Sequence, residues 1–312
     1  MQNRNILLLD TGIKKGGRIS CVDVLSGQYW QVKNKIGGGK KMEKYKRILV
    51  IGDIHGCFKK LMSLWKKISV TSEDLVIFLG DYVDRGRENV EVLKWIMKEF
   101  KKKNVVALCG NHDDMLKTDI LAGYVNTNAY GTLGEIALQN LKEPHFEDEV
   151  FKFLKNLPYS FEMEIGEKKY FFCHAGVDPA FPLDKQDELD LLWIREKFFS
   201  LYDGKKIIVV GHTSPMFLKT DEEITQRLTE FKNRSENRGK NLTEIVDEIV
   251  DEYEEGNDSP FFKTDEEIRA VKNYKPEWRR GGKILMTDTC PFLSNGCISC
   301  VDLISGDLWQ SD

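Results

Sequence analysis

Four stretches of the chain share a local pattern, in which a short apolar run is followed by a glycine and then by a residue able to bind a metal. In a fifth stretch a histidine follows the run directly, and the five stretches are residues 48–56, 75–86, 105–113, 170–176 and 207–213. Glycine allows the backbone to turn sharply beside a metal ion or a phosphate. Of the chain's five histidines, all but His145 lie in these stretches. The pattern therefore predicts a metal site.

The metal-binding side chains in these stretches are carboxylates, imidazoles and one carboxamide, namely Asp53, His55, Asp81, Asn111, His174 and His212. A set of this kind, without a thiolate, suits Mn²⁺, Fe or Zn²⁺. The set is larger than one catalytic ion with an open position requires, whereas a bridging carboxylate would let it hold two ions. We therefore expect two divalent ions, with Mn²⁺ favoured and Asp81 as the bridge.

Helical periodicity between the first apolar runs indicates how these residues are positioned. Apolar residues recur at spacings of three and four in two segments, as Phe58, Leu61, Met62, Trp65 and Ile68 and as Leu93, Ile96, Met97 and Phe100. Alternating strands and helices predict an α/β fold whose inner strands are largely parallel and covered by helices. Ligands gather at the carboxyl ends of such strands, so the five stretches should share one edge.

The motifs and their order resemble a known family. Gly-Asp-Ile-His-Gly, Gly-Asp-Tyr-Val-Asp-Arg-Gly, Gly-Asn-His-Asp, His-Ala-Gly and Gly-His-Thr resemble the phosphoprotein phosphatase branch of the calcineurin-like metallophosphoesterases, in particular bacterial serine/threonine protein phosphatases. The resemblance covers roughly residues 46–220 and the C-terminal strands. It implies a sandwich of two mixed sheets flanked by helices, with a di-metal site at the carboxyl ends of the strands and a closing C-terminal hairpin. It also implies that Asp53, His55 and Asp81 hold the first ion, and Asp81, Asn111, His174 and His212 the second.

Other residues in the motifs are candidates for proton transfer and phosphate binding. His112, beside Asn111, is the best candidate for the general acid, and Asp84 is the best partner to orient it; the resemblance implies the same pair. Arg85 can contact phosphate oxygens with two hydrogen bonds, and Asn111 is a further candidate for phosphate contact. Arg195 lies in a segment, residues 191–198, that resembles the source of a second phosphate-binding arginine in bacterial members, although a helix-surface arginine is the alternative.

These features predict a metallophosphatase that hydrolyses phosphoserine and phosphothreonine on proteins, by attack of a hydroxide bound to both ions. The alternative is a hydrolase of dinucleoside polyphosphates, of the diadenosine tetraphosphate type, or of another small phosphoester. Asp113 and Cys57 replace the glutamate and glutamine of eukaryotic members, which favours both bacterial classes. Residues 114–160 should determine the substrate. A non-catalytic phosphate-binding scaffold is disfavoured, because the set of catalytic residues is complete.

Composition limits the partners of this 312-residue chain. Charges of both signs are abundant and the net charge is −4, so no nucleic-acid partner is expected. No apolar run is long enough to cross a bilayer and no signal peptide is evident, so we expect a cytoplasmic protein without a membrane partner. The seven cysteines are scattered. Cys297 and Cys300 form a Cys-x-x-Cys inside a predicted strand, and we leave them outside the site.

The chain also contains an internal repeat. Residues 17–31 closely parallel residues 296–310, the hairpin expected to end the catalytic domain. We therefore divide the chain into an N-terminal extension, residues 1–41, and a catalytic domain, residues 42–312. The extension would add a hairpin at a sheet edge or compete with its C-terminal twin. Its glycine-rich linker ends before Met42, and we hypothesise that Met42 was the start of a downstream copy.

A charged segment interrupts the predicted catalytic domain between about residues 221 and 280. Close to half of its residues are charged, and one amphipathic helix is indicated by Leu242, Ile245, Ile249 and Val250. We interpret the segment as an insertion. It would form a solvated helical flap near the active site or a lid that selects a substrate or partner.

Overall fold

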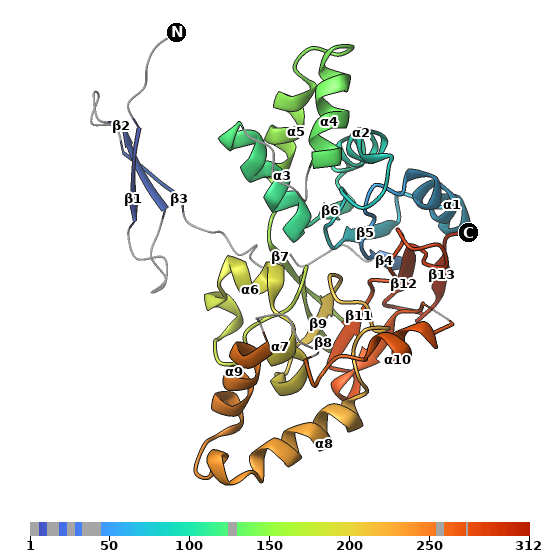
Figure 1. Ribbon diagram of the computed structural model, residues 1–312. Coiled ribbons are helices and arrows are strands. Elements are labelled where there is room, and N and C mark those ends of the chain that lie inside the picture. Colours follow the sequence, from blue (N-terminus) through green and yellow to red (C-terminus); the bar gives the residue numbers. More distant parts are fainter. Residues whose placement is uncertain are drawn as a thin grey trace.

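Two five-stranded mixed sheets form the centre of the computed structural model (Figure 1). The first sheet has the order β13-β12-β4-β5-β6, and its strands are β4 (Arg47–Ile51), β5 (Asp74–Phe78), β6 (Val105–Ala107), β12 (Ser299–Asp302) and β13 (Leu308–Gln310). The second has the order β10-β11-β9-β8-β7, and its strands are β7 (Ser160–Ile165), β8 (Lys168–Cys173), β9 (Ile207–Val210), β10 (Glu277–Arg279) and β11 (Ile284–Met286).

The inner strands of both sheets are parallel. β4, β5 and β6 run parallel in the first sheet, and β8, β9 and β11 run parallel in the second. The C-terminal hairpin of β12 and β13 closes the first sheet, with β12 antiparallel to β4. Parallel strands bring their carboxyl ends to one edge, so this topology places the loops after several strands together.

The residues of β4 explain why the sheets stack. Ile48 and Val50 point into an apolar cluster shared with the second sheet, which contributes Phe172 and Val209. The alternate residues of β4 point away from that sheet and pack beneath helices. β4 is therefore apolar on both faces, as a strand buried inside a sandwich must be.

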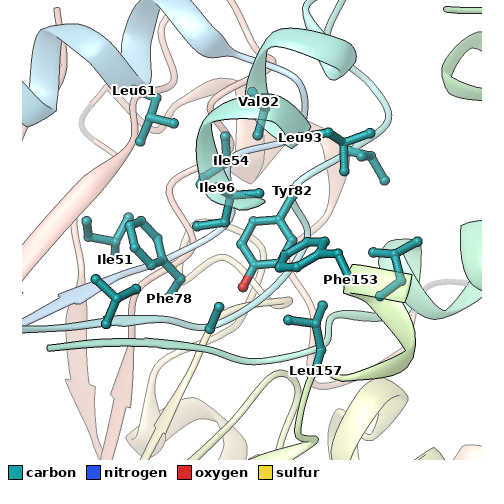
Figure 2. Close-up of a cluster of buried hydrophobic side chains, with 14 of the residues drawn as sticks. Ile51, Ile54, Leu61, Phe78, Tyr82, Val92, Leu93, Ile96, Phe153 and Leu157 are labelled. Atoms are coloured by element: carbon teal, nitrogen blue, oxygen red, sulfur yellow. The ribbon is translucent and has the colours of Figure 1, made fainter. Parts of the chain in front are cut away.

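Helices cover the outer face of each sheet (Figure 1). The first sheet is covered by α1 (Phe58–Ile68), α2 (Asn89–Glu99), α3 (Asn111–Ala122), α4 (Tyr130–Asn140) and α5 (Phe146–Lys155). The side of the second sheet carries α6 (Glu188–Trp193), α7 (Glu196–Leu201), α8 (Asp221–Lys232), α9 (Leu242–Tyr253) and α10 (Asp265–Arg269). Figure 2 shows Leu61 of α1 and Ile96 of α2 packed with Phe78 of β5 and Phe153 of α5. The predicted α/β sandwich of two mixed sheets flanked by helices is confirmed.

The charged segment 221–280 forms helices that are exposed on one side and packed on the other. Its two long helices, α8 and α9, bury an apolar face each, including Leu228 and Phe231 of α8 and Ile249 of α9. β10 then joins the second sheet by pairing with β11. The predicted amphipathic helix is present as α9, and only the outward faces of α8 and α9 carry the charges.

The N-terminal strands β1 (Ile6–Asp10), β2 (Ile19–Asp23) and β3 (Tyr29–Val32) form a sheet of their own and pair with no other described strand. The pairing of β2 with β3 reproduces that of β12 with β13. Cys21 is paired with Trp30 in the same register as Cys300 with Trp309. The repeat in sequence is therefore also a repeat in backbone pairing.

The structure describes these three strands and residues 45–123, 130–253, 259–272 and 274–312. The linker that ends before Met42 lies outside the described residues, as does part of the segment expected to determine the substrate, residues 124–129. Among the described residues, no helix has both the length and the apolar character needed to span a bilayer.

Candidate metal centre

The predicted metal ligands meet at the shared edge, in loops with unusual backbone geometry. His55 follows β4, Asp81 follows β5 and His212 follows β9, and these residues have positive φ angles of 45°, 53° and 57°. Such angles are costly outside glycine and concentrate at functional sites. The fold therefore holds three predicted ligands in conformations that their sequences do not favour.

Two glycines before the ligands provide space for carboxylates from other strands. A Cβ on Gly110 would lie 2.2 Å from Oδ1 of Asp81, and a Cβ on Gly211 would lie 2.2 Å from Oδ1 of Asp53. Neither position can therefore carry a side chain while the carboxylate stays in place. Positions 110 and 211 must therefore be glycine, because the carboxylates of Asp81 and Asp53 occupy the space that a side chain would fill.

Asp81 lies between two groups of side chains that could each hold a metal ion. One group consists of His55, Asp81 and His112, and the other of Asp81, His174 and His212, with the ligand atoms of each group within 4.8 Å of one another. Asp53 is close to the first group, because its Oδ2 is 3.8 Å from Nε2 of His55. Asp81 is the shared member, as a bridging ligand would be.

Backbone carbonyls orient two of the histidines toward Asp81. Nδ1 of His55 lies 2.9 Å from the carbonyl oxygen of Val83, and Nδ1 of His174 lies 3.0 Å from that of Leu79. Donation from Nδ1–H leaves each Nε2 with a free lone pair. Both Nε2 atoms are 3.4 Å from Oδ2 of Asp81. The two backbone carbonyls thus turn the Nε2 atoms of both imidazoles toward Asp81.

Asn111 connects His174 with His212. Its Oδ1 lies 2.9 Å from Nε2 of His174 and 3.1 Å from Nδ1 of His212. Nε2 of His212 is buried and has no hydrogen-bond partner among the described residues. The nitrogen and oxygen donors that gather on the Nδ1 side of His212, from Asp81, Asn111 and His174, suit a divalent transition metal. The residues present therefore fit a pair of such ions.

The electrostatics of the centre also favour metal binding. Burial lowers the pKa of His55 to about 3, although Asp81 opposes this shift. Burial and the cation of Arg195 hold the pKa of His212 well below its ordinary value. Burial acts against ionisation of Asp81, but the imidazoles of His174 and His55 more than offset it and hold the pKa of Asp81 well below its usual range. Neutral His55 and His212 and an ionised Asp81 are in the forms that ligate metals. Burial opposes a charge on His174, but Asp81 more than offsets it and raises the pKa of His174, so a bound metal would displace a proton from this imidazole.

His112, Asp84 and Arg85 lie beside the centre as a connected set. Nδ1 of His112 is 2.8 Å from Oδ2 of Asp84, and both side chains are buried. Oδ1 of Asp84 accepts a hydrogen bond from the hydroxyl of Thr132. Arg85 is exposed, and its Nη2 lies 3.4 Å from Nε2 of His112. Nε2 of His112 therefore faces the open side of the site, next to a guanidinium.

Arg195 also lies at the centre. It precedes α7, is partly buried, and its Nη1 donates to Oγ1 of Thr213, the residue after His212. Two aromatic rings flank the ligands. The ring of Trp193, 43% exposed, stands edge-on to His212 with centroids 6.0 Å apart, and the ring of Phe292 stands edge-on to His55 at 5.3 Å.

Asp288 is a buried acid of this region that the motifs did not indicate. It follows β11 and is 4% exposed. Burial raises the pKa of Asp53 well above its ordinary value, and the nearby charges of Asp288 and Asp81 add to this effect. Burial likewise raises the pKa of Asp288 to about 6. An acid after an apolar run was the available signal, but neither a glycine nor a histidine adjoins Asp288.

The family model of the calcineurin-like phosphoesterases matches residues 46–243. The chain belongs to the calcineurin-like phosphoesterase family. The predicted resemblance is thus confirmed, and it includes bacterial serine/threonine protein phosphatases. The family model ends inside α9, so β10, β11 and the C-terminal hairpin of this phosphoesterase lie beyond it.

The relatives of the phosphoesterase carry names of two kinds. Serine/threonine-protein phosphatase 2 of Salmonella typhimurium is 31% identical over 169 residues, which are 51% of this chain and 73% of that protein. The symmetrical bis(5'-nucleosyl)-tetraphosphatase of Buchnera aphidicola is 33% identical over 130 residues, which are 41% of this chain and 43% of that protein. A solved structure provisionally identified as a diadenosine tetraphosphatase has a TM-score of 0.51 at 17% identity, and the match covers 85% of this chain and 92% of that one. Relatives of both predicted substrate classes are therefore similar to this chain.

Proposed function

We propose that this phosphoesterase hydrolyses phosphoserine and phosphothreonine on proteins, and that two divalent ions, with Mn²⁺ favoured, bind at Asp81. The observation that carries the proposal is the position of Asp81, shared by two ligand groups, next to the connected side chains of His112, Asp84 and Arg85. Asp53, His55 and Asp81 would hold one ion. Asp81, Asn111, His174 and His212 would hold the other.

Two divalent ions held by these residues would lower the pKa of a water molecule and would neutralise charge on the phosphoryl oxygens. The side chains around them supply the rest of the chemistry. Asp84 accepts a hydrogen bond from Nδ1–H of His112, which fixes the orientation of the ring and turns Nε2 toward the place of the leaving oxygen. Departure of a serine or threonine alkoxide requires a proton, and His112 is placed to donate it.

Two arginines are placed to bind the phosphoryl group. Arg85 is exposed beside His112, and Arg195 reaches the loop after β9 on the side of His212. A guanidinium can donate two hydrogen bonds to a phosphate and keeps its charge at any working pH. We propose that Arg85 and Arg195 hold the phosphoryl group from opposite ligand groups, with Asn111 as a further contact.

A second candidate function is hydrolysis of dinucleoside polyphosphates. Trp193 and Phe292 place aromatic rings beside His212 and His55, where a base joined to the reacting phosphate could stack. The similarity to proteins named as bis(5'-nucleosyl)-tetraphosphatases supports the same candidate.

The two candidate functions are distinguished by comparing the catalytic efficiency of the enzyme on two substrates. Metal-stripped protein would be supplied with Mn²⁺, and kcat/KM would be measured for a phosphothreonine peptide and for diadenosine tetraphosphate. The Asp81→Asn variant would be assayed in parallel. A higher kcat/KM for the peptide that is lost in the variant supports a protein phosphatase. A preference for the dinucleotide would replace that conclusion with nucleotide hydrolysis, and metal-independent or absent turnover of both would refute the proposed centre.

A further inference from the structure

Asp288 occupies the same place on β11 that His212 occupies on β9. β11 runs parallel to β9, and Met286 of β11 is paired with Val210 of β9. Asp288 comes two residues after Met286, just as His212 comes two residues after Val210. The pairing continues one step further, because the N–H of Thr287 donates to the carbonyl oxygen of Val210 at 2.8 Å. Asp288 is thus a sixth strand-end residue at the edge that gathers the ligands.

Close backbone packing brings this strand end against the loop that carries Asp53. A Cβ on Gly52 would lie 2.6 Å from the carbonyl oxygen of Thr287, so the chain before Asp288 lies directly over the chain before Asp53. The two carboxylates are therefore carried by adjoining segments, although they come from different sheets.

One oxygen of Asp288 is left without a strong partner. Its Oδ1 accepts the N–H of Cys290 at 2.8 Å, whereas the only hydrogen-bond partner of Oδ2 among the described residues is the thiol of Cys290 at 4.0 Å. The residue is 4% exposed, so solvent contributes little. A buried carboxylate normally has several donors or a cation. Oδ2 of Asp288 therefore has capacity for another ligand.

We propose that Asp288 is a metal-binding residue of this centre, and that its charge and free Oδ2 act on the ion held by Asp53 and His55. The inference rests on the proposed di-metal centre. In the metal-free protein, burial and mutual repulsion oppose the ionisation of three neighbouring carboxylic acids, Asp53, Asp81 and Asp288. A divalent cation beside them removes that repulsion and is itself bound more tightly.

The alternative role for Asp288 is structural, because its Oδ1 bonds to the N–H of Cys290 and so forms a local turn. Asp288→Asn separates the two roles. The amide oxygen of Asn can still accept that N–H, and the side chain keeps its shape, but the charge is lost. A purely structural role predicts unchanged metal affinity in this variant.

The test is titration of metal-free protein with Mn²⁺ by calorimetry, together with thermal unfolding of the metal-free and metal-loaded protein. The Asp288→Asn variant should bind Mn²⁺ about 10- to 100-fold more weakly at one of two sites. Its metal-free form should be no less stable than wild type, because repulsion is relieved. Asp288→Glu keeps the charge and should retain more affinity than the Asn variant.

Asp74→Asn is the matched control, since Asp74 is equally buried but pairs with Arg47 away from the centre. It should lower the stability of the metal-free protein and leave Mn²⁺ affinity unchanged. Affinity within about twofold of wild type in Asp288→Asn, or equal losses in the Asn and Glu variants, would overturn the role of Asp288. Wild-type protein that binds no Mn²⁺ would instead refute the centre itself.

Discussion

The hydrogen bond between Asp84 and His112 supports our proposal that His112 donates a proton to the departing alkoxide. Replacing either residue by Asn should lower kcat for a phosphothreonine peptide by about 100-fold or more. The kcat for p-nitrophenyl phosphate should fall much less, because the p-nitrophenolate group leaves without needing a proton. The measurement is kcat on both esters at saturating Mn²⁺.

His145→Asn is the control for this pair, because His145 lies on the surface with an exposed side chain. That variant should match wild type on both esters. Equal losses on the two esters in the His112 and Asp84 variants would show that the pair does not protonate the leaving group.

Asp113 binds the backbone of the two loops that carry Asp81 and Asn111. It is fully buried and accepts hydrogen bonds from the backbone N–H groups of Gly110, Asp81 and Tyr82 at 2.9, 2.7 and 3.0 Å. Asp113→Ala leaves three buried N–H groups without an acceptor, which should cost at least about 3 kcal/mol of unfolding free energy. Urea denaturation of the metal-free protein measures this loss.

Asp148→Ala is the corresponding surface variant, since Asp148 is exposed and its ion pair among the described residues is with the exposed His145. This variant should lose less than about 1 kcal/mol of unfolding free energy. A similar small cost for Asp113→Ala would show that the backbone N–H groups find other acceptors and that Asp113 does not hold the loops.

The sequence predicted the residues that meet at Asp81 because each follows an apolar run and belongs to a local motif. Asp288 and Thr132 escaped prediction for a different reason. β11 has only three residues, and its place beside β9 depends on pairing between segments far apart in the chain. Thr132 reaches Asp84 only through the packing of α4. Contacts set by tertiary packing leave no local pattern to read.

At the scale of elements, Arg47 and Asp74 join the beginnings of β4 and β5. Nε and Nη2 of Arg47 donate to the two carboxylate oxygens of Asp74 at 2.9 and 2.7 Å. Burial acts against the charge on Asp74, but the hydrogen bonds from Arg47 and Thr71 more than offset it and lower its pKa below the ordinary value of 3.8. The ion pair joins β4 and β5 at their first residues, and Asp53 and Asp81 follow the opposite ends of these two strands.

Asp74→Asn should therefore destabilise the protein by about 2 kcal/mol at neutral pH. Because the pKa of Asp74 is lower in the folded than in the unfolded protein, its contribution is present above 3.8 and is lost as the pH falls through the folded value. Urea denaturation of both proteins over a pH series measures the difference. If the difference in unfolding free energy between wild type and Asp74→Asn stayed constant or grew as the pH fell, Asp74 would not stabilise the protein through this ion pair.

The charged segment shows where composition misleads at this scale. The apolar residues of α9 recur at helical spacing and predicted that helix, whereas α8 carries few apolar residues among many charges. Yet Ile224, Leu228 and Phe231 of α8 lie on one face and are buried. A narrow apolar stripe is sufficient when neighbouring helices cover it, and mean composition does not reveal the stripe.

At the scale of the whole molecule, the two copies of the hairpin have different places. β12 pairs with β4, which carries Asp53 at its end, whereas β2 pairs with β1 in a separate sheet. We propose that residues 42–312 are the catalytic domain and that residues 1–41 are dispensable for catalysis. Deletion of residues 1–41 should leave kcat/KM and Mn²⁺ affinity within about twofold of wild type.

The matched deletion removes residues 296–312, the C-terminal copy. It uncovers the edge of β4 and removes the carboxylate of Asp302, which accepts the N–H of Ile48 at 2.9 Å. Loss of folding and activity is expected. Loss of activity on deletion of residues 1–41 instead would show that the N-terminal copy is part of the working enzyme.

The most direct measurement is a titration of the metal-stripped enzyme with Mn²⁺ while p-nitrophenyl phosphate hydrolysis and bound metal are both recorded. We expect no hydrolysis without metal, full activity at two bound ions per chain, and neither full metal binding nor activity in Asp81→Asn. Hydrolysis that persists without metal, or an Asp81→Asn variant as active as wild type, would contradict a catalytic di-metal centre bridged by Asp81.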